Sequence, residues 1–238
     1  MSRVVSNLED AEQLQQWRKE SDKLTNDYLN SVFLKMFGKS LERENHLEIK
    51  SLEQLTSAIV DCPHSTPIYQ KVTTEFSCIR TSELKDGYID WTSMKYVDKE
   101  TFVLRTKRLT PREGDVIYGR EGSFGEAVRV PKNAQICLGQ RVLLLRPESS
   151  LCTSAFLWAL LRSKLVYNQA LNNTKGSTVG HIDVKAIKKF KVFCPPLVLQ
   201  QNFSSIMEKI EILRKHSSQS GKHINDFGNL MKQEMFWS

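Results

Sequence analysis

Apolar residues recur at helical spacing in both terminal segments of the sequence. Residues 7–37 contain neither Gly nor Pro, and the apolar positions of residues 197–236 are separated mainly by steps of three and four, as in a seven-residue frame. Pro195 and Pro196 predict a helix start near residue 197. Since a helix of about forty residues would span ~60 Å, we expect an antiparallel coiled coil. Its expected core and interface positions are Leu14, Trp17, Leu24, Tyr28, Phe203, Ile206, Ile210, Leu213, Ile224, Phe227 and Met231.

The middle of the chain has the shorter periods of a mixed α/β domain. "KDGYIDW" (85–91) places Asp-Gly between extended runs and predicts a hairpin. Residues 114–120, 126–131, 141–147 and 190–196 are expected to be strands, and 154–171 an amphipathic helix with Phe156, Leu160 and either Val166 or Tyr167 inward. The predicted fold class is therefore α+β. The expected domains are an N-terminal helix (1–38), a mixed α/β domain (39–196) and a long C-terminal helix (197–238).

The two helical segments also resemble each other. "NDYLNSVFLKMF" (26–37) and "NDFGNLMKQEMF" (225–236) align without gaps at an offset of 199 residues. This similarity indicates one period of a longer repeat, in which a helix, a globular block and a second helix follow one another.

Charge distinguishes the middle block from the ends. The 238 residues carry a net charge of +7, and residues 39–196 hold all of it, with 24 Lys and Arg against 17 Asp and Glu. A basic block between neutral helices favours a polyanionic partner. The five cysteines contain no Cys-x-x-Cys pair, so we expect reduced core thiols in a cytoplasmic protein. No apolar run approaches the ~18 residues of a membrane span.

Several short motifs suggest enzymes, but their contexts do not fit. "GREGSFGEAVRV" (119–130) resembles a kinase glycine loop, yet the strand lysine and the catalytic loop that a kinase needs are absent, and "DFG" (226–228) lies in the heptad frame. We expect Gly119, Gly122 and Gly125 to form tight turns instead. Asp61, Glu83 and Lys85 fit only a loose nuclease pattern, and "CPPL" (194–197) lacks the amide of an amino-methyltransferase motif. Nothing in the sequence indicates a catalytic role for this chain.

A more specific resemblance covers about residues 45–236. The segments "DCPHSTP" (61–67), "GDVIYGREGSFGEAVRVP" (114–131), "LGQRVLLLRP" (138–147) and "NNTKGSTVGHIDVKAIKKFKVFCPPLVLQQNF" (172–203), followed by a long helix, resemble the specificity subunit of type I restriction-modification systems. That subunit carries two target recognition domains and two spacer helices, whereas this chain is similar to half of it. Two copies paired antiparallel through 7–37 and 197–236 would rebuild the whole.

The resemblance implies a DNA-recognition subunit without catalytic activity, in a bacterial or archaeal cytoplasm. Each recognition domain binds one half of a split site in double-stranded DNA, and the helices set the spacing of the half-sites. The methyltransferase subunits bring S-adenosylmethionine and the restriction subunits use ATP and magnesium, so no cofactor is expected on this chain. Three alternatives remain: a recognition subunit or fragment of a type II-like restriction-modification enzyme, an enzyme of DNA cleavage or modification with this domain attached, and a scaffold that occupies methyltransferase without binding DNA.

Candidate DNA contacts lie on polar loops of the middle block. Ser177 or Thr178 could contact phosphate or cap a helix over 183–188. Arg80 could reach a base or pair with Glu83. Arg120 could face DNA or neutralise Glu121 or Glu126. The expected DNA-binding residues are His64, Ser65, Thr66, Arg80, Arg120, Ser123, Lys175, Ser177, Thr178 and His181.

Overall fold

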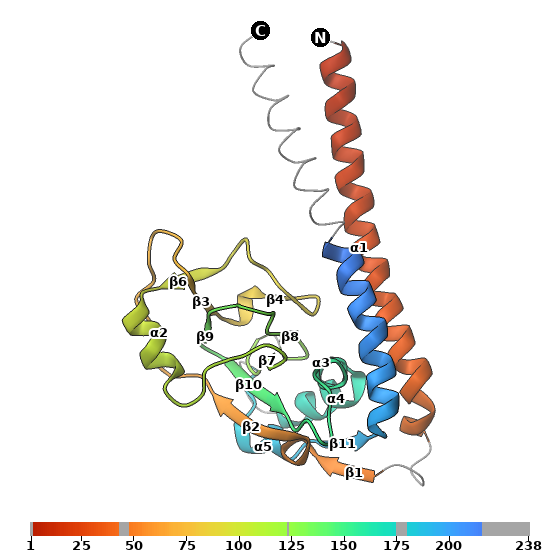
Figure 1. Ribbon diagram of the computed structural model, residues 1–238, viewed down its shortest axis with the longest axis vertical. Helices are drawn as coiled ribbons and strands as arrows, with labels where there is room; N and C mark the ends of the chain where they lie inside the picture. Colours follow the sequence, from red (N-terminus) through yellow and green to blue (C-terminus); the bar gives the residue numbers. More distant parts are fainter. Residues whose placement is uncertain (1, 43–47, 123, 175–179, 216–238) are drawn as a thin grey trace. The chain divides into compact units, whose positions relative to one another are not determined.

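The structure is a computed structural model that describes residues 2–42, 48–122, 124–174 and 180–215 (Figure 1). Its contacts divide the chain into two compact units, one formed by residues 1–35 with 205–238 and the other by residues 36–204. Long helices accompany several small sheets, so the predicted α+β fold class is confirmed. The functional boundaries expected after residues 38 and 196 remain a prediction.

Two long helices form the helical unit. Helix α1 (Ser2–Glu42) is one uninterrupted element, and the C-terminal helix is described over 197–215, starting directly after Pro196 as predicted. Arg214 donates from Nη1 to Asn26 Oδ1 over 2.8 Å, while Phe203, eleven residues earlier, packs on Phe37. The later residue of the C-terminal helix thus contacts the earlier residue of α1, so the two helices are antiparallel. They run side by side in Figure 1.

The seven-residue frame predicts the buried positions of these helices only in part. Phe203 and Ile210 are buried, but Met207 rather than Leu213 continues the buried stripe of the C-terminal helix, and Ile206 is half-buried. On α1 the buried large residues are Leu29, Phe33 and Phe37, four residues apart. A second apolar stripe stays exposed in the single chain, namely Leu14, Trp17, Leu24, Tyr28 and Leu213. The predicted positions Ile224, Phe227 and Met231 lie outside the described residues.

A four-stranded antiparallel sheet forms the centre of the larger unit. Its order is β2 (Thr56–Asp61), β10 (Val142–Pro147), β7 (Val116–Gly119) and β8 (Ala127–Arg129). Leu143 pairs with Asp61 on one side and Tyr118 on the other. The end of β2, the end of β7 and the start of β10 therefore lie side by side at the same end of the sheet.

Smaller sheets and short helices complete this unit. A three-stranded sheet has the order β6 (Lys95–Val97), β3 (Phe76–Ile79) and β9 (Ile136–Leu138), and β1 (Glu48–Ser51) pairs with β11 (Lys191–Cys194). Helix α2 spans Lys99–Thr106, and short 3-10 turns span Leu52–Leu55 and Thr81–Glu83. All five cysteines are free thiols, four of them buried. Within the described ranges, no helix is long and apolar enough to cross a membrane.

The predicted hairpin is present. It joins β4 (Leu84–Lys85) to β5 (Tyr88–Ile89), and the two linking residues Asp86 and Gly87 both have positive φ, 52° and 85°. Two consecutive left-handed residues are the requirement of a type I′ turn, which Asp-Gly satisfies with little strain. The local sequence was sufficient to predict this element.

The single helix expected over 154–171 was wrong. Helix α3 (Ser154–Leu161) is followed by its cap residue Arg162. Helix α4 (Lys164–Asn173) begins after Ser163, which has an extended backbone and whose side-chain oxygen accepts from Val166 N. Serine competes for helix backbone groups in this way and favours caps over helix interiors. Val166 is buried and Tyr167 is exposed, which decides between the two inward residues considered.

The expectation of a tight turn at Gly119 was also wrong, and the cap of α5 is a residue that the sequence analysis did not consider. Gly119 is not a turn residue, because it is the buried last residue of β7 and pairs with Val142. Helix α5 (Val184–Lys188) is capped by Asp183, whose carboxylate accepts from Lys185 N over 2.7 Å. Ser177 and Thr178, the caps considered from the sequence, lie outside the described residues. A cap is normally the residue immediately before the first turn, and Asp183 occupies that position.

Candidate nucleic-acid interface

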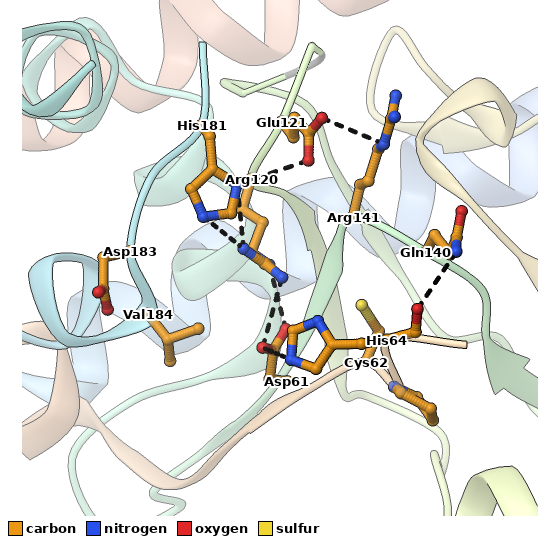
Figure 2. A pocket seen from close by; sticks show the side chains of 11 residues that line it. Asp61, Cys62, His64, Arg120, Glu121, Gln140, Arg141, His181, Asp183 and Val184 are labelled. Carbon is orange, nitrogen blue, oxygen red and sulfur yellow. Dashed lines mark hydrogen bonds and ion pairs between the residues drawn. The ribbon is translucent and has the colours of Figure 1, made fainter. Parts of the chain in front are cut away.

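A polar cleft of about 390 Å³ opens at the end of the sheet where β2 and β7 terminate and β10 begins (Figure 2). Strand β2 supplies Asp61, the residue after β7 is Arg120, and the residue before β10 is Arg141. The segment leading into α5 closes the cleft from the other side. The lining residues are Asp61, Cys62, Pro63, His64, Arg120, Glu121, Gln140, Arg141, His181, Asp183 and Val184.

Arg120 lies at the base of the cleft with 5% of its surface exposed. Its Nε is 3.0 Å from Asp61 Oδ1, and its Nη1 is 3.1 Å from a ring nitrogen of His181. Figure 2 shows the guanidinium between these two side chains. Backbone bonds fix the position, since Arg120 N donates to Arg141 O and Ile182 N donates to Arg120 O. Arg120 thus neutralises Asp61, and both carboxylate partners considered from the sequence were wrong.

The two expected partners of Arg120 are engaged elsewhere. Glu121 Oε1 is 3.2 Å from Arg141 Nε at the rim of the cleft, and Glu121 Oε2 is 3.5 Å from His181 Nδ1. Glu126 accepts from Gly87 N over 3.1 Å, and burial raises the pKa of its carboxyl group. The cleft therefore contains two arginine–carboxylate pairs, with His181 in contact with both.

The loop after β2, which carries His64, Ser65 and Thr66, is fixed by hydrogen bonds from Arg105 and Gln140. Arg105, 8% exposed, donates from Nε to Leu138 O and from Nη1 to Ser65 O, over 2.8 and 3.0 Å. Gln140 donates to Thr66 Oγ1 over 2.9 Å. His64, Ser65 and Thr66 are exposed, and His64 Nε2 lies 3.4 Å from Asp61 Oδ2. A buried cation that satisfies backbone carbonyls keeps a loop of three exposed polar side chains in one conformation.

Arg80 pairs with Glu83, as one of its two interpretations predicted. Its Nη2 and Nε lie 2.6 and 3.2 Å from the two oxygens of the fully buried Glu83 carboxylate. This hydrogen bonding raises the pKa of Arg80. The Arg80 guanidinium also lies 5.6 Å from the centre of the Tyr69 ring. A DNA contact by Arg80 remains a prediction.

The loose nuclease pattern finds no support in these contacts. Asp61 faces Arg120 and Glu83 faces Arg80, so each carboxylate is balanced by an arginine. Among the described residues, no three His, Cys, Asp or Glu side chains gather as metal ligands would.

The structure brings His64, Arg120 and His181 together in the cleft, with Ser65 and Thr66 on its flanking loop. Ser123, Lys175, Ser177 and Thr178 lie outside the described residues. Sequence reasoning missed the lining residues Asp61, Glu121, Gln140, Arg141 and Asp183 as parts of this site. The one local signal for Gln140 and Arg141 was their position directly before the apolar strand "VLLL", where a strand end brings polar side chains to a sheet edge.

Fold and cleft together define a mixed α/β binding module attached to long antiparallel helices. Residues 72–220 match the family described as "Type I restriction modification DNA specificity domain". The chain belongs to this family. No curated protein matches the chain.

Solved structures of type I restriction-modification proteins share the fold. A chain from a study of "complex assembly and conformational transition of the type I R-M system" is 15% identical, with a TM-score of 0.52. The HsdS subunit from Thermoanaerobacter tengcongensis is 14% identical with a TM-score of 0.50, and the S subunit from M. genitalium is 12% identical with a TM-score of 0.55. These alignments cover 97–99% of this chain but only 55–57% of the solved chains. The chain thus spans little more than half their length.

Proposed function

We propose that this chain is the sequence-specific DNA-recognition subunit of a type I restriction-modification complex and that it binds one half of a bipartite site in double-stranded DNA. The observation that carries the proposal is the family match over residues 72–220, which includes most of the basic middle block. Within that block, the cleft offers arginine, glutamine and histidine donors beside an exposed polar loop. Such groups are the ones that proteins direct at DNA.

The helices form a scaffold for the other subunits in this proposal. Methyltransferase subunits dock on them and bring S-adenosylmethionine, and restriction subunits follow with ATP and magnesium, so this chain itself acts without a cofactor and without catalysis. The complex works in the cytoplasm of a bacterium or archaeon.

A second copy of this chain supplies the second target recognition domain, so that the pair corresponds to a whole specificity subunit. The exposed stripe of α1 lines a groove of about 520 Å³ together with the C-terminal helix, and Trp17, Leu24, Tyr28 and Leu213 are among its apolar walls. Arg214 and Asp22, 3.6 Å apart, provide charges of both signs at the same groove. Charges of both signs are compatible with a self-complementary interface, in which each patch meets its own copy across a twofold axis.

DNA recognition is tested by co-purification with the methyltransferase subunit, followed by sequencing of methylated adenines in the host genome. A split, symmetric methylated motif is the expected result for a paired half-subunit. Binding to a matching duplex should weaken by ~10³ between 50 and 200 mM salt, for about six phosphate contacts per domain. A complex that neither retains DNA nor leaves a methyl mark contradicts the proposal and favours a scaffold that only occupies methyltransferase.

Pairing is tested by light scattering on the purified chain at micromolar concentration. We expect twice the monomer mass for the wild type and a monomer for the double variant Trp17→Glu, Leu24→Glu, because buried charges oppose association. Lys19→Glu, which changes an exposed polar position of the same helix outside the groove, is the matched control. A monomeric wild type in the absence of partners would count against the dimer but not against DNA recognition.

A further inference from the structure

The charges that line the cleft do not suit a phosphate. Arg120 and Arg141 are opposed by three carboxylates, those of Asp61, Glu121 and Asp183. The first two are already paired with the two arginines, at 3.0 and 3.2 Å. An anion that entered would meet carboxylates at short range and would have to displace them from their partners. The neutral edge of a base, which carries both donors and acceptors, meets no such repulsion.

Arg141 has a backbone conformation that its side chain does not favour. Asp86, Asn133 and Arg141 are the described non-glycine residues with positive φ, at 52°, 59° and 68°. Asp and Asn tolerate the left-handed region because their short side chains bond the local backbone, whereas a long side chain such as that of Arg gains nothing there. Strain of this kind persists where the surrounding structure requires a particular direction of the side chain.

The surroundings of Arg141 give its guanidinium a defined direction. Its carbonyl accepts from Arg120 N over 3.0 Å, and the next residue, Val142, is already in the ladder with Gly119. Glu121 Oε1 holds Nε, the atom at the root of the guanidinium fork, while 56% of the side chain stays exposed (Figure 2). A flexible cation can meet a phosphate from many directions, but a bidentate contact to a base needs this orientation.

The neighbouring Gln140 is oriented as well. Its Nε2 donates to Thr66 Oγ1 over 2.9 Å and lies 3.4 Å from His64 O, so the amide is fixed against the loop after β2. Two consecutive side chains that both pair with base edges, Gln and Arg, thus stand at the mouth of the cleft in fixed positions.

We propose that Gln140 and Arg141 determine sequence specificity, with Arg141 contacting an acceptor-rich base edge such as that of guanine, and that the cleft accepts base edges rather than phosphates. This inference rests on the proposed function, since it assumes that the chain binds double-stranded DNA. Phosphate contacts are then made by cations outside the cleft.

The test is a selection from a randomised double-stranded DNA pool, using the full chain in complex with the methyltransferase subunit with which it co-purifies. Arg141→Asn removes the guanidinium while keeping a residue that tolerates positive φ, so its melting temperature should equal or exceed that of the wild type. We expect Arg141→Asn to lose about 5- to 150-fold of discrimination at one base pair, with an unchanged slope of affinity against salt. Arg141→Lys, which keeps the charge but loses the fork, should lose the same preference.

Controls separate the possible failures. Lys132→Asn removes one charge at an exposed turn outside the cleft and should leave the preferred sequence unchanged. A uniform loss of affinity over all sequences in Arg141→Asn, with the salt slope reduced by about one and full rescue by Arg141→Lys, would identify a phosphate contact and overturn the inference. So would an unchanged motif in Arg141→Asn. A wild type that enriches no sequence would instead overturn the proposed function, and this inference with it.

Discussion

Arg120 illustrates how much a single residue depends on partners distant in the chain. From the sequence its nearest carboxylates were Glu121 and Glu126, yet the strand order of the sheet brings Asp61 within 3.0 Å. Both members are largely shielded from water, with side chains 6% and 17% exposed. The two opposite charges therefore face each other where little water can screen them.

Replacing Arg120 alone should lower the free energy of unfolding by more than replacing both Arg120 and Asp61. We expect Arg120→Met to lower the free energy of unfolding by about 3 kcal/mol, because the largely buried Asp61 side chain then loses its arginine partner. The double variant Arg120→Met, Asp61→Asn should recover at least about 1 kcal/mol of this loss. Urea unfolding of the two single variants and the double variant gives the coupling energy. Strict additivity would mean that the contact contributes nothing to folding.

Asp183 stabilises helix α5 as its N-terminal cap. Its carboxylate accepts from Lys185 N at the start of α5. Asp183→Ala should destabilise the protein by about 1 kcal/mol, whereas Asp183→Ser, which retains a capping oxygen, should lose only a few tenths of that amount. Thermal unfolding distinguishes the two. Equal melting temperatures for the Ala and Ser variants would rule out a significant capping contribution.

At the scale of elements, turn chemistry was predictable and helix ends were less so. The Asp86-Gly87 hairpin follows from a two-residue signal. The break between α3 and α4 depends on Ser163, which the apolar periodicity of 154–171 does not register. Hydrophobic spacing reports which face of a segment is buried, and it continues in phase across a cap that interrupts the helix.

The hairpin turn provides a sharp test at this scale. A Cβ at position 87 would lie 2.6 Å from the Arg162 guanidinium carbon and from the Trp158 ring, at a φ of +85°. We therefore expect Gly87→Ala to lower the free energy of unfolding by at least about 2 kcal/mol, from backbone strain and from displacement of these side chains. Asp86→Asn, which also tolerates positive φ, is the matched control and should change it by less than about 0.5 kcal/mol. Urea unfolding measures both, and a wild-type midpoint for Gly87→Ala would refute the steric argument.

At the scale of the whole molecule, four phenylalanines join elements from both ends of the sequence. Phe37 lies near the end of α1, and its ring centre is 5.2 Å from that of Phe156 in α3, 6.3 Å from Phe193 in β11 and 5.8 Å from Phe203 in the C-terminal helix. All four side chains are fully buried or nearly so. All four belong to the larger unit, so the last residues of α1 and the first turns of the C-terminal helix are part of its core.

Truncation inside this cluster should be among the most destabilising changes in the chain. We expect Phe37→Ala to cost about 3–5 kcal/mol, since it removes a large buried ring and leaves a cavity between rings that cannot collapse together. Phe37→Leu keeps most of the volume and should cost less than half as much. The measurement is chemical unfolding followed by circular dichroism. A loss below about 1 kcal/mol for Phe37→Ala would mean that α1 contributes little to the stability of the α/β unit.

Local sequence alone determined the helix start after Pro196, the hairpin at Asp86-Gly87, the strands around 116–119 and 142–147, and the basic character of the middle block. These features depend on neighbours within a few residues or on composition, so they can be predicted without knowledge of the tertiary structure. Tertiary structure alone decided which carboxylate Arg120 meets, which apolar stripe of α1 stays exposed, and which side chains share the cleft. The cleft joins residues 61–64, 120–121, 140–141 and 181–184. The strand order of the sheet brings the first three segments together, and an isolated bridge between Glu121 and His181 adds the fourth. No spacing in the sequence encodes either arrangement.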